Sequence, residues 1–137
     1  MLFFSQSGII RIMKFLYRVW GKVQPGNNRG KALGFPTVNI PLHKNIPEGV
    51  YISKTKIENR EFSSLTFIGA ARTFDSRIKK VETYIFDFDK SVYGKWVSVS
   101  LFKKIRGNIK FNSKKELVEQ IKKDLIMAKD LFKSVIS

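Results

Sequence analysis

The 137-residue chain contains no cysteine and only one histidine, His43. The lack of cysteine excludes disulfides, thiolate metal sites and a cysteine nucleophile, and a single histidine excludes a metal site built from several imidazoles. No apolar run approaches the roughly 20 residues that a membrane-spanning helix needs. The apolar segment 1–12 lacks the basic region that precedes the hydrophobic part of a secretory signal. We therefore expect a cytoplasmic protein without a membrane partner.

Acidic residues are also scarce, with 11 Asp and Glu against 26 Lys and Arg and a formal net charge of +15. Such a charge attracts polyanions, which include nucleic acid, an anionic membrane surface and nucleotide phosphates. A general bias towards lysine in the composition explains much of this excess equally well. The hydrophobic content of 43% is that of a globular protein, and the length suits one domain. The charge limits the class of ligand without selecting one.

The hydrophobic pattern predicts strands followed by one helix. Strand-like segments occupy residues 15–24, 49–57, 64–68, 81–88 and 96–102, and residues 34–39 are extended. A turn is expected at Asn59-Arg60, and a basic connection over residues 103–112 contains Arg106. Ser113 and Glu116 form a capping box, after which apolar residues follow at helical spacing. The pattern predicts an all-β core, a small antiparallel barrel closed or plugged by the terminal helix.

The segment Gly34-Phe35-Pro36-Thr37-Val38-Asn39 follows a glycine-rich basic loop. Pro36 lacks a backbone donor and keeps the preceding residue extended, so this segment is not helical. Side chains two apart then point the same way, which directs Thr37 and Asn39 to one place. Their neutral oxygens suit a hard cation that already carries phosphate oxygens, such as Mg²⁺. The same spacing fits an ordinary strand start, and taken alone it favours that structural interpretation.

The preceding loop combines glycine with cationic side chains. Only three residues separate Gly26 from Gly30, so it is not a Walker A loop. Glycine still lets backbone N–H groups approach an anion closely, and Arg29 and Lys31 add positive charge. The loop fits a phosphate-binding segment and a solvated connection equally well.

The segment 81–88 alternates, which places Glu82, Tyr84, Phe86 and Phe88 on one face of the predicted strand. A lone carboxylate at the head of an aromatic face is partly removed from water. Such an environment is one way in which proteins prepare a general base. The alternative is a strand-end glutamate that pairs with one of the many lysines.

In their order along the chain, these motifs resemble the ATP-dependent riboflavin kinase domain. The resemblance covers residues 15–132 and is carried most specifically by the Gly-Phe-Pro-Thr-x-Asn segment after a glycine-rich loop. The other matching segments are Gly21-Lys22-Val23, Gly49-Val50-Tyr51, Ile68-Gly69, Val81-Glu82, Asp87-Phe88, Tyr93-Gly94, Ile105-Arg106, Lys110-Phe111 and the helix over 117–128.

The resemblance implies a six-stranded antiparallel Greek-key barrel with a C-terminal α-helix over residues 15–137, preceded by an extension over residues 1–14. It also implies transfer of the γ-phosphate of ATP to the 5′-hydroxyl of riboflavin, which gives FMN and ADP and requires Mg²⁺. The chain lacks the sequence of the adenylyltransferase domain fused to this kinase in many bacteria, so FAD synthesis is not expected.

The resemblance further implies a role for each candidate residue. Thr37 and Asn39 would hold the magnesium and the phosphates, Glu82 would be the general base, and Arg106 would belong to the region that closes on the flavin. The loop residues that would cover the nucleotide phosphates are Gly26, Arg29, Gly30, Lys31 and Gly34.

Two alternative functions stay open at this point. A basic barrel could hold single-stranded nucleic acid through aromatic and lysine side chains, although this would not explain Thr37, Asn39 and Glu82 in this order. A degenerate kinase homologue could bind flavin or nucleotide without turnover, because Ala71-Arg72 stands where family members often have Asn-Pro. We expect an active, monomeric kinase without a nucleic-acid partner.

Overall fold

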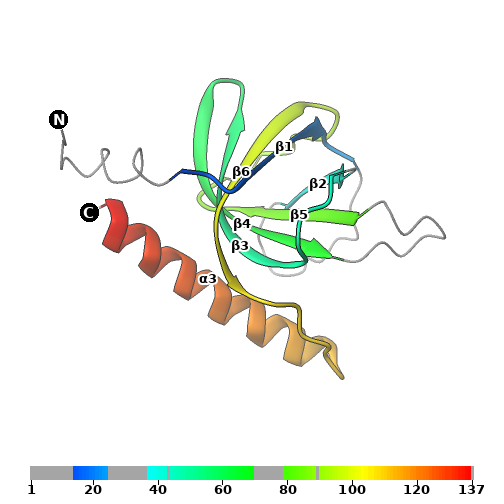
Figure 1. Ribbon diagram of the computed structural model, residues 1–137, viewed down its shortest axis with the longest axis vertical. Coiled ribbons are helices and arrows are strands. Elements are labelled where there is room, and N and C mark those ends of the chain that lie inside the picture. The colour runs from blue at the N-terminus through cyan, green and yellow to red at the C-terminus, as the bar shows by residue number, and fades with distance from the viewer. Residues whose placement is uncertain (1–13, 25–36, 43, 70–78, 89, 137) are drawn as a thin grey trace.

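The computed structural model describes residues 14–24, 37–42, 44–69, 79–88 and 90–136 (Figure 1). These residues form one six-stranded antiparallel sheet with the order β1-β6-β3-β4-β5-β2. The elements are β1 (Tyr17–Lys22), β2 (Thr37–Leu42), β3 (Gly49–Ile57), β4 (Arg60–Gly69), β5 (Lys79–Ile85), β6 (Trp96–Arg106) and α3 (Lys114–Ile136).

The two outer strands, β1 and β2, come together and nearly close the sheet into a barrel. The backbone N–H of Gln24 donates to the carbonyl of Asn39 at 2.7 Å, an isolated bridge just beyond the end of β1. A Cβ atom at Gly21 would lie 2.2 Å from Cγ2 of Ile40 on β2, so only glycine permits this approach. The six-stranded barrel implied by the resemblance is confirmed.

Two separate apolar clusters hold the fold together. One fills the barrel interior and includes Val19, Val38, Ile40, Ile68, Val81, Val99 and Leu101. The other joins the outward-facing side chains of β3, β4 and β5 to the helix and consists of Val50, Ile52, Leu65, Tyr84, Phe86, Ile121, Leu125 and Ala128. Helix α3 therefore covers the outer face of the barrel, so the prediction that it plugs the barrel is wrong. Its apolar stripe finds an apolar partner on that face, while the interior is already filled.

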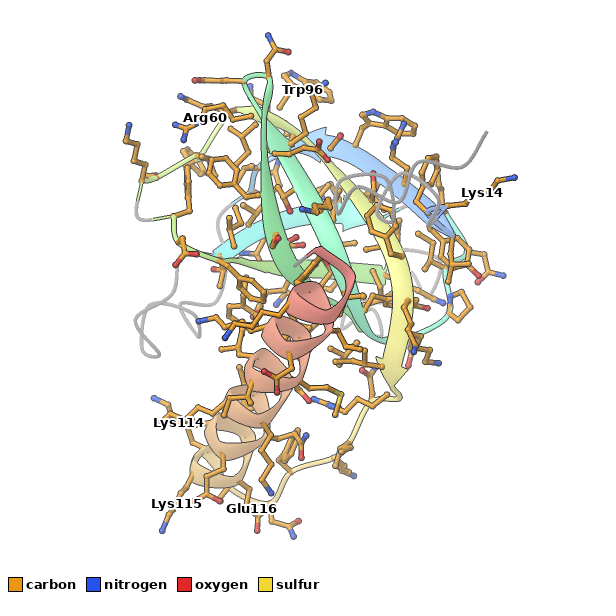
Figure 2. All side chains as sticks on the ribbon, turned by 90° about the vertical axis from the view of Figure 1, so that its left-hand side faces the viewer. Lys14, Arg60, Trp96, Lys114, Lys115 and Glu116 are labelled. Carbon is orange, nitrogen blue, oxygen red and sulfur yellow. The ribbon has the colours of Figure 1, made fainter. Side chains whose placement is uncertain are left out.

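Figures 1 and 2 show α3 running along the outside of the barrel. Lys114, Lys115 and Glu116 mark the start of the helix, at the opposite end of the molecule from Arg60 and Trp96 (Figure 2). The N–H of Glu116 donates to Oγ of Ser113 at 3.2 Å, as the capping box predicts. In a capping box the glutamate side chain also accepts from the N–H of the capping residue, here Ser113. Oε2 of Glu116 instead accepts from the N–H of Asn112, one residue earlier, at 3.1 Å. No helix in the described part of the chain has both the length and the apolarity to cross a membrane.

A chain of hydroxyl groups also lies inside the barrel, and the sequence pattern did not predict it. All five residues are fully buried, and successive oxygens are 2.8, 2.7, 2.7 and 2.9 Å apart in the order Thr55, Ser64, Ser53, Thr66 and Thr83. Each hydroxyl can donate one hydrogen bond and also accept. The chain therefore satisfies polar groups that would otherwise destabilise an apolar interior.

Several strand boundaries differ from the expected ones, including those of β4, β5 and β6. Strand β4 begins at Arg60, before the expected start at residue 64, because the turn is centred on Glu58 and Asn59, both with positive φ. Strand β6 continues to Arg106, so the connection expected from residue 103 begins as strand. The alternation over 81–88 stops at the end of β5, since Asp87 has φ 54°.

The change of backbone direction at Asp87 moves Phe88 off the face that the alternation assigned to it. Phe88 packs against the cluster in the barrel interior, with its ring 4.9 Å from that of Phe62. Phe86 belongs to the outer cluster together with Tyr84. The prediction of one continuous aromatic face is therefore wrong at Phe88.

Candidate active site

The pairing of β2 with β5 brings the candidate residues together. Thr37 lies opposite Tyr84, and Asn39 lies opposite Glu82. Residues directly opposite each other in an antiparallel pair have Cβ atoms about 5 Å apart on the same face. Val38 belongs to the barrel interior, so these four side chains face outward. The predicted shared face of Thr37 and Asn39 is observed, and Glu82 lies on it.

Asn39 and Glu82 are both 6% exposed. Oδ1 of Asn39 is buried and receives no hydrogen bond from the described residues. Leaving a buried acceptor without a donor costs about 1–3 kcal/mol, so such atoms are rare in native proteins. A buried amide oxygen that accepts nothing from the described residues, on the residue paired with Glu82, is suited to a bound cation or a ligand donor.

Glu82 has a partner that sequence reasoning missed. The hydroxyl of Tyr84 donates to Oε1 of Glu82 at 2.5 Å. On the neighbouring strand β4, Phe67 lies opposite Glu82, and its ring packs edge-on against that of Tyr84 with centroids 5.2 Å apart. The spacing of two residues along one strand was the available signal for the Glu82–Tyr84 contact.

Arg106, predicted to approach the flavin, forms an ion pair at the end of β6. Its Nε and Nη2 donate to Oδ1 and Oδ2 of Asp124 on α3, at 2.8 and 2.6 Å. Asp124 is 1% exposed and also accepts from Nε2 of Gln120 at 3.0 Å. The guanidinium lies over the ring of Phe67, with Cζ 5.9 Å from its centroid. Arg106 thus joins α3 to the aromatic residues beside Glu82.

The predicted phosphate-binding loop lies outside the described residues. This applies to Gly26, Arg29, Gly30, Lys31 and Gly34, whose role stays a prediction. Among the residues that the structure does describe, no group of three or more His, Cys, Asp or Glu side chains could hold a metal. Thr37 and Asn39, the predicted metal ligands, are both among the described residues, and their metal-binding role stays a prediction.

Comparison with known proteins matches this chain to one enzyme family. The family model for riboflavin kinase (flavokinase) matches residues 13–132. The chain is 39% identical over 121 residues to the bifunctional riboflavin kinase/FMN adenylyltransferase of Haemophilus influenzae, covering 86% of this chain and 39% of that protein. This chain thus spans well under half the length of that relative.

Solved structures share the fold. The riboflavin kinase of Trypanosoma brucei has a TM-score of 0.57 at 26% identity, over 85% of this chain and 79% of that chain. A macrolide-efflux protein from Streptococcus pneumoniae has a TM-score of 0.73 at 34% identity, over 82% of this chain and 38% of that chain. Shared fold does not transfer an activity, and the efflux description concerns that protein. The match of the family model supports the kinase interpretation over the nucleic-acid-binding alternative, and the chain belongs to the riboflavin kinase family.

Proposed function

We propose that this chain transfers the γ-phosphate of ATP to the 5′-hydroxyl of riboflavin, forming FMN and ADP, with Glu82 as the general base. The observation that carries the proposal is that buried Glu82 lies opposite Asn39 in the pairing of β2 with β5, and that Oδ1 of Asn39 accepts no hydrogen bond from the described residues. Phosphoryl transfer depends mainly on positioning and on neutralising the transferring group, without a covalent enzyme intermediate. Family membership supports riboflavin and ATP as the substrates.

Glu82 acts on the acceptor alcohol. Its carboxylate accepts a hydrogen bond from the 5′-hydroxyl of riboflavin and takes the proton as the oxygen bonds to the γ-phosphorus. The bond between that phosphorus and the bridging oxygen breaks, and ADP leaves with the electron pair. A positioned general base contributes about 10²–10⁴-fold to such a step.

The oxygens of Thr37 and Asn39 fit a magnesium ion that also carries phosphate oxygens. Magnesium is commonly held by few protein ligands and completes its shell with phosphate and water. The buried Oδ1 of Asn39 lacks a donor among the described residues, as a ligand oxygen would before the cation binds. When bound, magnesium would offset negative charge on the phosphates.

The remaining assignments follow from the resemblance and stay proposals. The loop containing Gly26, Arg29, Gly30, Lys31 and Gly34 would cover the nucleotide phosphates, and Arg106 would contribute to flavin binding. The cytoplasmic location and the monomeric state also stay predictions.

Purified protein incubated with riboflavin, ATP and magnesium should form FMN and ADP in equal amounts, because each phosphate lost by ATP appears on riboflavin. Chromatographic separation of the flavins and nucleotides measures both products. Flavin binding without FMN would indicate the degenerate homologue. Salt-sensitive binding of an oligonucleotide, with no response to flavin, would instead support the nucleic-acid alternative.

Asn39→Ala should weaken magnesium-dependent ATP binding by about tenfold, because the buried amide oxygen is lost. Thr37→Val should act in the same direction, whereas Thr37→Ser keeps the hydroxyl and serves as the matched control. Calorimetric titration with ATP, with and without magnesium, measures the effect. An unchanged magnesium requirement in Asn39→Ala would rule out this metal site.

A further inference from the structure

The hydrogen bond between Tyr84 and Glu82 is short and protected from water. The phenol oxygen is 2.5 Å from Oε1 of Glu82, and Tyr84 and Glu82 are 1% and 6% exposed. A hydroxyl that donates to a carboxylate makes one of the stronger hydrogen bonds in proteins, with a short distance of this kind. This bond restricts how the carboxylate can rotate about the end of its side chain.

The ring of Tyr84 is itself held in place. Phe67 packs against it edge-on, with an angle of 89° between the rings, and Leu65 lies opposite it on β4. Ile121 and Leu125 of α3 belong to the same buried cluster. Close packing of this kind leaves a buried side chain one favoured rotamer. The hydroxyl therefore has a defined position set by β4, β5 and the helix.

We propose that Tyr84 is a positioning residue for the phosphoryl transfer and holds the Glu82 carboxylate in the orientation in which it accepts the proton of the riboflavin hydroxyl. This inference rests on the proposed function, in which Glu82 is the general base. Tyr84 acts through Glu82, because its hydroxyl donates to that carboxylate and its ring is packed in the buried cluster beneath α3. An orientation that matters in the transition state affects kcat more than it affects substrate binding.

Tyr84→Phe removes the hydroxyl and keeps the packed ring. We expect kcat for FMN formation to fall by about tenfold, with the KM values for riboflavin and ATP changed by no more than about twofold. In a Glu82→Gln background the same substitution should change kcat by less than about twofold, because the effects of substituting two groups that act as a unit are not additive. Steady-state kinetics of the four proteins measure this coupling.

Tyr51→Phe is the matched control. Tyr51 is also 1% exposed, and its hydroxyl donates to the carbonyl of Pro47 at 2.6 Å. It belongs to the interior cluster, on the opposite face of the sheet from Glu82. Burial, with Tyr17 nearby, raises the pKa of Tyr51, as expected for a phenol kept neutral. Removing the Tyr51 hydroxyl should lower the thermal midpoint of unfolding without lowering kcat.

The outcomes separate the two levels of the proposal. Absence of FMN formation by the unmodified protein overturns the proposed function and this inference with it. FMN formation by the unmodified protein, together with an unchanged kcat in Tyr84→Phe, overturns the positioning role alone. A tenfold loss that persists in the Glu82→Gln background also overturns it, since Tyr84 would then act independently of Glu82. Loss of kcat confined to the background with an intact Glu82 supports it.

Discussion

Glu82→Gln is expected to lower kcat for FMN formation by about 100-fold or more, while riboflavin and ATP still bind. Glutamine has nearly the same shape as glutamate, and its amide oxygen still accepts a hydrogen bond from Tyr84. It cannot take the proton of the riboflavin hydroxyl at neutral pH. The substitution therefore removes the base and preserves the surrounding packing.

The expected loss lies in the chemical step, so kcat should fall much more than KM rises. Flavin fluorescence and calorimetry with ATP measure binding, and chromatographic detection of FMN measures turnover. Glu61→Gln makes the same change of charge at an exposed position six residues before Phe67 along β4. It should leave kcat unchanged. Undiminished turnover in Glu82→Gln would remove Glu82 from the mechanism.

Asp124→Ala is expected to cost about 3–5 kcal/mol of unfolding free energy. The substitution leaves the Arg106 guanidinium, whose side chain is 16% exposed, without its carboxylate partner. It also removes the acceptor that Gln120 uses. An uncompensated charge in a largely buried position is much more costly than the loss of an exposed ion pair.

Denaturant unfolding measures the loss of stability in Asp124→Ala. Two further variants serve as comparisons. Asp130→Ala changes an exposed carboxylate on the same helix and should cost under about 1 kcal/mol. Arg106→Met combined with Asp124→Leu replaces the ion pair with apolar packing and should regain most of the lost stability. A loss in Asp124→Ala no larger than that in Asp130→Ala would show that this ion pair contributes little.

The double variant also tests the flavin role predicted for Arg106. Stability and flavin affinity report on different contacts of the same side chain. A stable Arg106→Met/Asp124→Leu protein with weakened riboflavin binding would support a direct contact between Arg106 and the flavin. Unchanged riboflavin binding in that protein would restrict Arg106 to joining β6 and α3.

Local rules account for what could be predicted correctly. The bounds of β3 agree with the expected segment 49–57, because β-branched residues lie between two turns. The helix begins where Ser113 and Glu116 predict it. The shared direction of Thr37 and Asn39 follows from the twofold repeat of an extended strand. Each of these features depends on residues only a few positions apart.

Other features depend on residues far apart in the chain, and no local pattern specifies them. Examples are the bidentate contact between Arg106 and Asp124 and the hydroxyl chain that passes through Ser53. The direction predicted for Phe88 was also wrong, because a positive φ at Asp87 interrupts the alternation that the sequence pattern continues to residue 88.

By itself, the sequence determined the element types, the likeness to one enzyme family and the identity of the polar residues available for catalysis. Only the tertiary structure decided that Asn39 faces Glu82, that Tyr84 holds that carboxylate, and that α3 covers the outer face of the barrel. The physical reason is that strand periodicity and helix caps are local, whereas the pairing of β2 with β5 and the choice of face for the helix depend on how the whole sheet packs.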